Sequence, residues 1–103
     1  MKDLIVVATL TAKPGHEATL KAALEKIVPP SRAEAGCSRY ELHADIEHAG
    51  RFVMIETWRD QRALTEHEAT PHFQALLQEV GGKVDVQVLK PVSYTHLTLP
   101  TKA

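Results

Sequence analysis

The sequence of 103 residues has no asparagine, a single cysteine and no long apolar run. The missing asparagine excludes any mechanism that needs an Asn side chain from this chain. Cys37 cannot form a disulfide within the chain, and a lone thiol of this kind favours a reducing compartment. The apolar run of residues 4–10 is too short to span a membrane, and no small-residue cleavage site follows it. We therefore expect a cytoplasmic protein that does not bind a membrane.

The chain also has no large excess of positive or negative side chains. The chain has 12 Lys and Arg residues against 13 Asp and Glu residues, for a net charge of -1. Since no basic stripe is visible, nucleic acid is not an expected partner. The apolar fraction of 44% and the charged fraction of 24% are typical of a globular domain, and the length predicts one domain.

Four segments have the composition and periodicity of β-strands. Residues 4–12 and 51–58 are largely apolar on both faces, which is typical of strands that are buried on both sides. Residues 37–45 and 83–90 alternate between apolar and polar side chains, which predicts strands with one exposed face.

Helical patterns lie between these strands. Residues 16–28 carry an apolar stripe, and Pro29-Pro30 should end that helix, with Ser31 capping a short further turn that stops at Gly36. Asp60 is a good N-cap for a helix over residues 61–68. Thr70 is an N-cap for the next helix, which starts with Pro71, covers residues 72–80 and stops at Gly81-Gly82.

The predicted order is β-α-β-β-α-β, with the second helical unit broken in two. This is the ferredoxin-like α+β pattern with an antiparallel sheet, in which the first and third strands are central. Helices would cover one face of the sheet only, so its other apolar face needs a second cover. We expect a homodimer, because the sheet of a second copy is the simplest cover.

The C-terminal segment differs in composition from the rest of the chain. We assign residues 1–92 to the domain and residues 93–103, which are rich in threonine and almost uncharged, to a tail. The tail is either an extended arm that pairs with a partner's sheet edge or a segment that is not native to the domain. It is left out of the functional argument.

Three stretches of the sequence resemble a known family. GCSRYELHAD, RFVMIETWRD and ALTEHEATPHFQAL resemble the antibiotic biosynthesis monooxygenase domain, and in particular its quinol-monooxygenase-like members. The resemblance covers about residues 3–92 and is most specific from Glu56-x-Trp58 through His67 to Thr70-Pro71-His72-Phe73. It implies a dimeric α+β barrel with a pocket in each subunit. It also implies oxidation of an aromatic phenol by molecular oxygen without metal, flavin or haem.

Relatives in this family also include haem-degrading enzymes and an isomerase of a phosphorylated signalling sugar. The haem-degrading branch uses an Asn on the first strand, a Trp on the broken helix and a His ten residues later. This sequence has apolar or small residues on the strand, His67 at the Trp position and Leu77 at the His position. We therefore expect no haem, and the resemblance to the quinol-monooxygenase-like members implies no other cofactor.

His67 and His72 are the candidate catalytic residues. Oxidation of a hydroquinone needs a base, and a neutral histidine can remove the phenolic proton. The C-terminal end of a helix should favour the imidazolium form of His67, and the N-terminal start of the next helix should favour the neutral form of His72. Which of the two is the base stays open. A metal site is not expected, because no distinctive ligand spacing is present.

Six further residues are candidates for binding the aromatic substrate. They lie on the predicted strands and the last helix: Tyr40, Phe52, Met54, Glu56, Trp58 and Phe73. Trp58 could be a core anchor or an aromatic wall, and Tyr40 a half-buried strand residue or a hydrogen-bond donor. A lone carboxylate in a closed pocket is costly, so Glu56 should be functional or paired with a base such as Arg39 or His67.

Two other functions remain open at this stage. One is an isomerase of a small phosphorylated carbonyl compound, for which Arg39, Arg59 and Arg62 are the candidate anion-binding residues. The other is a non-catalytic dimeric module that binds a small molecule, which a pocket filled by side chains would favour.

Overall fold

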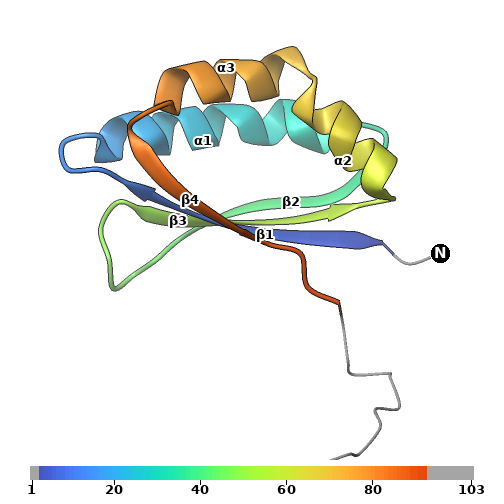
Figure 1. The fold of residues 1–103 in the computed structure, drawn as a ribbon, viewed down its shortest axis with the longest axis horizontal. Helices are drawn as coiled ribbons and strands as arrows, with labels where there is room; N and C mark the ends of the chain where they lie inside the picture. The colour runs from blue at the N-terminus through green and yellow to red at the C-terminus, as the bar shows by residue number, and fades with distance from the viewer. Residues whose placement is uncertain (1–2, 93–103) are drawn as a thin grey trace, which may run out of the picture.

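The structure is a computed structural model that describes residues 3–92. One antiparallel sheet forms one layer, and three helices form a second layer on one of its faces (Figure 1). The elements follow the order β1 (Leu4–Ala12), α1 (Glu17–Arg32), β2 (Cys37–Ala44), β3 (Arg51–Trp58), α2 (Gln61–Glu68), α3 (Pro71–Val80) and β4 (Val84–Leu89). The predicted tail, including its possible role as an arm, lies outside the described residues.

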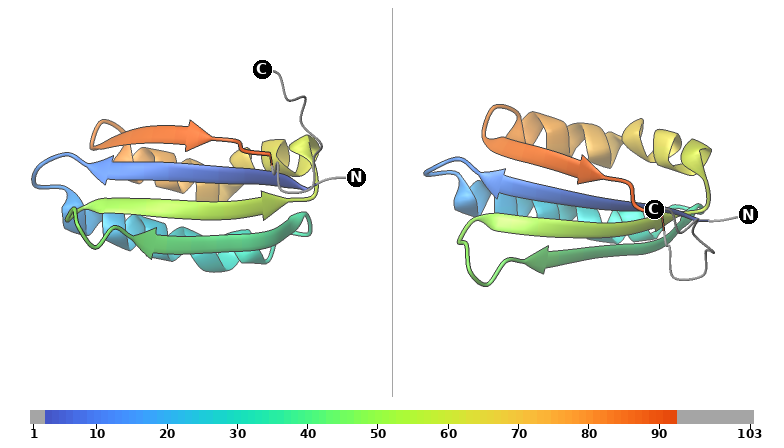
Figure 2. Two further views of the ribbon diagram at one scale, coloured as in Figure 1. Left: turned by 90° about the horizontal axis from the view of Figure 1, so that it is seen from below. Right: turned by 60° about the horizontal axis from the view of Figure 1, so that its bottom comes forward.

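The sheet has the strand order β2-β3-β1-β4, so β1 and β3 are central. This confirms the ferredoxin-like α+β fold and the assignment of central and edge strands from their periodicity. The views in Figure 2 show the helices behind the sheet and no element of the described chain in front of it. The front face is therefore open, as the apolar residues on both faces of β1 and β3 predicted.

Side chains on the covered face of the sheet meet in cross-strand rows. Tyr40 lies opposite Glu56 on β3, and Glu56 lies opposite Val6 on β1. In the next row, Met54 lies opposite Ala8. An irregularity in β2 between Cys37 and Arg39 sets the register in which Tyr40 reaches this face. These rows form the floor of the site described below.

The end of α1 differs from the prediction. The helix continues through Pro29 and Pro30 to Arg32, although each proline removes one backbone N–H from the helical ladder. The helix is held because its buried stripe extends past the prolines to Ser31, which is fully buried against the rest of the domain. The N–H of Ala33 donates to the carbonyl of Pro29 at 3.2 Å. Ser31 is thus a residue of the helix and not the cap of a separate turn.

The broken helix is confirmed. Asp60 accepts a hydrogen bond from the N–H of Ala63 at 2.8 Å and caps α2, and Thr70 accepts one from the N–H of Phe73 at 3.2 Å and caps α3. Pro71 occupies the first turn of α3. Among the described residues, no helix is long and apolar enough to cross a membrane.

Candidate active site

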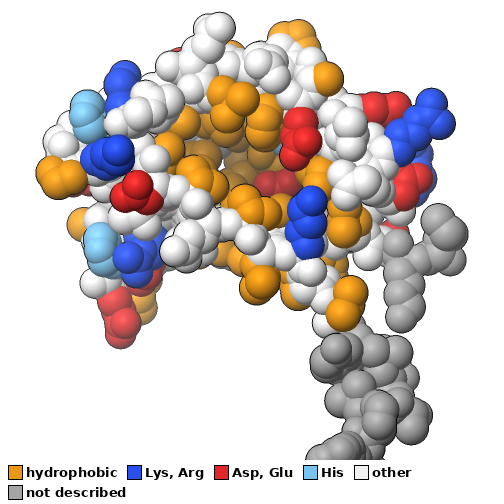
Figure 3. All heavy atoms as spheres, viewed as in Figure 1, with side chains coloured by type: hydrophobic (Ala, Val, Ile, Leu, Met, Phe, Trp, Pro, Cys, Tyr) orange, Lys and Arg blue, Asp and Glu red, His pale blue; other side chains and the backbone are white. Residues whose placement is uncertain are grey.

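A cavity of about 350 Å³ lies between the sheet and the helices. Figure 3 shows it as a hollow whose walls are mostly hydrophobic, with acidic groups in and beside it. Apolar side chains of β1, β3, β4 and α3 supply most of its lining, and its charged lining residues are Glu56, Glu68 and Lys90. A volume of this size is in the range of small-molecule sites.

The structure brings together five of the eight residues predicted for the site. Those that line the cavity are Tyr40, Met54, Glu56, His67 and Phe73. The other three, Phe52, Trp58 and His72, are not among its lining residues. Trp58 is fully buried and packs edge-to-face against Tyr40, with ring centroids 6.1 Å apart, so it is part of the core behind the site.

His67 is almost fully buried, with 1% of its surface exposed. Its ring packs against three aromatic rings, with centroids 4.5 Å from Trp58, 5.1 Å from Phe73 and 5.4 Å from Tyr40. Nε2 of His67 is buried and has no hydrogen-bond partner among residues 3–92. A buried ring nitrogen without a partner is costly, and this one belongs to a residue that lines the cavity.

Burial lowers the pKa of His67 below its ordinary value, although the carboxylate of Glu34 acts in the opposite direction. The prediction that the helix end would favour the imidazolium form is therefore wrong. The helix dipole acts on a solvated group by a modest amount, whereas His67 is desolvated by the surrounding aromatic rings. The neutral form that a general base requires is favoured.

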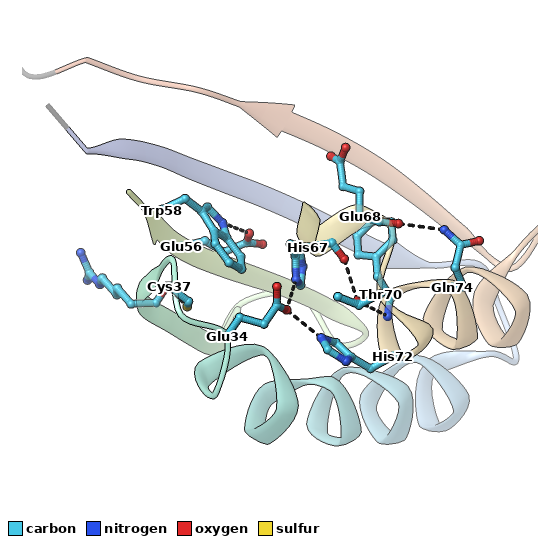
Figure 4. A network of polar contacts seen from close by, with 11 residues as sticks. Glu34, Cys37, Glu56, Trp58, His67, Glu68, Thr70, His72 and Gln74 are labelled. Carbon is cyan, nitrogen blue, oxygen red and sulfur yellow. Dashed lines mark hydrogen bonds and ion pairs between the residues drawn. The ribbon is translucent and has the colours of Figure 1, made fainter. Parts of the chain in front are cut away.

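Glu34 is the site residue that the sequence did not reveal. It lies in the connection between α1 and β2, and its Oε2 is 2.6 Å from Nδ1 of His67 and 2.7 Å from Nε2 of His72 (Figure 4). The connection passes so close to α2 that a Cβ on Gly36 would collide with the side chain of Ala63. No local pattern marks a glutamate that meets histidines 33 and 38 residues away.

Glu56 is a buried carboxyl group in the floor of the cavity. It accepts a hydrogen bond from Nε1 of Trp58 at 2.8 Å. Its predicted partners are engaged elsewhere, since Arg39 pairs with Glu41 and His67 with Glu34. Burial raises the pKa of Glu56 to about 7, and the Trp58 hydrogen bond only partly opposes this. At neutral pH a substantial fraction of Glu56 is therefore protonated and can donate a hydrogen bond.

Tyr40 lies opposite Glu56 in the cross-strand row and is 3% exposed. Burial, and then the negative charge of Glu56, raise the pKa of its phenol above the ordinary value. Its hydroxyl therefore stays protonated at any physiological pH. Tyr40 and protonated Glu56 are two potential donors to the oxygen atoms of a ring bound in the cavity.

Glu34, His67 and His72 are also a group that could hold a metal ion, with ligand atoms within 4.8 Å of one another. Ligands about 2.0–2.1 Å from a shared tetrahedral ion would lie about 3.3 Å apart. The Glu34 oxygen is closer than this to both nitrogens, at 2.6 Å and 2.7 Å. These separations are those of charge-assisted hydrogen bonds, so the side chains as placed are arranged for proton sharing.

Comparisons with known proteins identify the family of this chain. The family model of the antibiotic biosynthesis monooxygenases matches residues 3–79. The chain belongs to the antibiotic biosynthesis monooxygenase family. Its sequence is 32% identical to the Escherichia coli protein named "Probable quinol monooxygenase YgiN", in an alignment that covers 85% of this chain and 97% of the relative.

Solved structures of similar proteins superpose well on the chain. The crystal structure of PA3566 from Pseudomonas aeruginosa has a TM-score of 0.87 and 39% sequence identity, and covers 90% of this chain and 95% of its own. Rv0793 from Mycobacterium tuberculosis has a TM-score of 0.78 and 32% identity, with coverage of 91% and 99%. Membership of the family supports a monooxygenase-like oxidoreductase that acts on a small molecule with oxygen.

Proposed function

We propose that this protein is a cofactor-independent monooxygenase that oxidises a hydroquinone or a related phenol with molecular oxygen. The observation that carries the proposal is His67, which lines an apolar cavity and whose buried Nε2 has no hydrogen-bond partner among residues 3–92. A largely apolar cavity suits a flat, uncharged ring and excludes water from the reaction.

The reaction needs no outside reductant, because a hydroquinone can supply all the electrons. His67 takes a phenolic proton, and the resulting anion passes one electron to O₂. The semiquinone and superoxide combine at a ring carbon to form a peroxide anion, and the imidazolium of His67 returns its proton to give the hydroperoxide. Loss of water, with the hydrogen of that ring carbon, breaks the O–O bond and leaves a hydroxyquinone. One oxygen atom enters the product and the other leaves as water.

The protein supplies binding, orientation and proton transfer in this scheme. Tyr40 and protonated Glu56 donate hydrogen bonds to the substrate oxygens, which stabilises the phenolate. Met54 and Phe73 form part of the apolar wall against the ring. In the assignment that we propose, His67 is the base and His72 is not, since only His67 lines the cavity.

The charges of the cavity count against an isomerase of a phosphorylated compound. None of the arginines that the sequence offered for anion binding, Arg39, Arg59 and Arg62, is among the lining residues. The charged lining residues are Lys90, Glu68 and the partly protonated Glu56, so a phosphate would meet no net positive charge. The cavity volume counts against the non-catalytic binding module, because that function was expected for a pocket filled by side chains.

Oxygen uptake with a panel of one-ring and two-ring hydroquinones tests the proposal. We expect uptake of one O₂ per hydroquinone, one ¹⁸O atom from ¹⁸O₂ in the product, and no change when EDTA is added. His43→Ala, which removes an exposed histidine on β2, is the matched control and should behave like the wild type. Uptake no faster than that of His67→Ala would contradict the proposal, and uptake that EDTA abolishes and a metal restores would contradict cofactor independence.

We also propose that the open face of the sheet packs against a second copy of the chain. This face carries the apolar side chains Ile5, Val7, Val53 and Ile55, which are only half-buried in the single chain. Light scattering should give about twice the monomer mass of 11.4 kDa. Val7→Lys should lower that mass, whereas Ile46→Lys, at a 98% exposed position in the β2–β3 connection, should not. A monomer mass for the wild type would rule out the dimer.

A further inference from the structure

The side chains of Glu34, His67 and His72 form a triad that leads from the cavity wall towards solvent. The exposed fraction of the side chain is 1% for His67, 16% for Glu34 and 22% for His72. They come from α2, the α1–β2 connection and α3, so three separate elements must pack correctly to form it. Figure 4 shows the Glu34 carboxylate between the two imidazole rings.

Counting hydrogens fixes the tautomers in the triad. A single carboxylate oxygen, Oε2 of Glu34, is within hydrogen-bond distance of both rings, so both rings must donate to it. His67 then carries its proton on Nδ1 when neutral, and its Nε2 keeps a free lone pair. His72 donates from Nε2 and is not among the residues that line the cavity.

The other charged groups around His67 do not replace Glu34. Glu68 on α2 is close enough to act on His67 electrostatically, and Glu56 on β3 is a second carboxyl group of the cavity lining. Neither of them forms a hydrogen bond with the His67 ring among the described residues. Glu34 is therefore the group that both orients the ring and faces its Nδ1 proton.

We propose that Glu34 is the positioning residue of the site: it holds His67 in the Nδ1–H tautomer and stabilises its imidazolium, while His72 restrains Glu34. This inference rests on the proposed role of His67 as the base. When Nε2 accepts the substrate proton, the positive charge formed on the ring lies against the Glu34 carboxylate. His72 shares the same oxygen and weakens that stabilisation, so the two neighbours of His67 act in opposite directions.

Opposite shifts in the titration of His67 are the signature of this arrangement. Glu34→Gln removes the negative charge and should lower the pKa of His67, whereas His72→Ala frees the carboxylate for His67 and should raise it. Nitrogen-15 NMR of the imidazole rings reports both the pKa and the tautomer. We expect mainly Nδ1–H in the wild type and in His72→Ala, and a mixture of tautomers in Glu34→Gln. His43→Ala is the control and should leave the His67 signals unchanged.

Kinetics provides a second and separate readout. Glu34→Gln should lower kcat by at least about tenfold with little change in KM, because orientation of the base is lost and the cavity is not. Glu34→Asp, which keeps the charge on a shorter side chain, should recover part of the activity. His72→Ala should keep most of it.

The two readouts separate failure of this inference from failure of the proposed function. Shifts of the His67 titration in the same direction in both variants, or Nε2–H as the main tautomer in the wild type, would overturn the role of Glu34 even in an active enzyme. The expected NMR shifts in a protein without oxygen uptake would leave the triad standing and refute the oxidation. Loss of activity in a folded His72→Ala equal to that in His67→Ala would overturn the division of roles.

Discussion

His67→Ala is expected to lower kcat for hydroquinone oxidation by about 100- to 10,000-fold, the usual contribution of a general base. The ring nitrogen that the substrate would meet is removed, and no other neutral base lines the cavity among the described residues. Since phenols reduce oxygen poorly before they lose a proton, residual activity should rise steeply with pH. The measurement is the pH profile of kcat by oxygen uptake.

Loss of packing must be separated from loss of the base, because His67 contacts three aromatic rings. The substitution leaves a space about the size of the lost ring, so added imidazole should restore part of the activity of His67→Ala. His43→Ala is the matched control, since it removes an exposed histidine that is not among the lining residues. A folded His67→Ala protein with the activity and pH profile of the wild type would remove His67 from the mechanism.

We expect the stability of Glu56→Gln relative to the wild type to depend on pH. The free energy of unfolding of the variant minus that of the wild type should be about 3 kcal/mol larger in alkaline solution than near pH 4.5. The pKa of Glu56 is raised from its ordinary value of 4.5 to about 7, and each pKa unit corresponds to about 1.4 kcal/mol. Between these values the folded state binds more protons than the unfolded state. The wild type therefore loses this stability as the pH rises from about 4.5 to 7, and glutamine cannot lose it.

Urea unfolding at pH 5, 6, 7 and 8 measures this difference. The lowered pKa of His67 contributes a slope of the opposite sign, but this slope is common to both proteins and cancels when they are compared. Glu66→Gln removes an exposed carboxylate on α2 and should follow the wild-type profile. If the free energies of unfolding of Glu56→Gln and the wild type differ by the same amount at every pH, Glu56 is not desolvated. A gain in stability accompanied by a lower kcat would indicate that Glu56 is kept for function.

Burial shifts the pKa values of Glu56 and His67 in opposite directions, and the site depends on both shifts. Burial raises the pKa of the acid and lowers that of the base, so both favour the neutral form near neutral pH. An apolar cavity with a neutral donor and a neutral acceptor suits a neutral hydroquinone, and charge appears only as the reaction proceeds.

The sequence by itself determined the elements and their arrangement. Apolar residues on both faces of 4–12 and 51–58, against alternation along 37–45 and 83–90, identified the central and edge strands. The caps Asp60 and Thr70 identified the break between α2 and α3. Such signals act between residues a few positions apart, or through a periodicity that any buried face imposes. The same signals placed Tyr40, Met54 and Glu56 on the face that lines the cavity.

Only the tertiary structure decided the chemistry of the site. It continued α1 through Pro29 and Pro30, and it brought Glu34 to His67 and His72 across 33 and 38 residues of sequence. It also gave Glu56 the indole of Trp58 as its partner. These outcomes depend on packing and desolvation, which are properties of the assembled core. A pattern of neighbouring residues predicts where a histidine lies, but its protonation depends on what surrounds it in the fold.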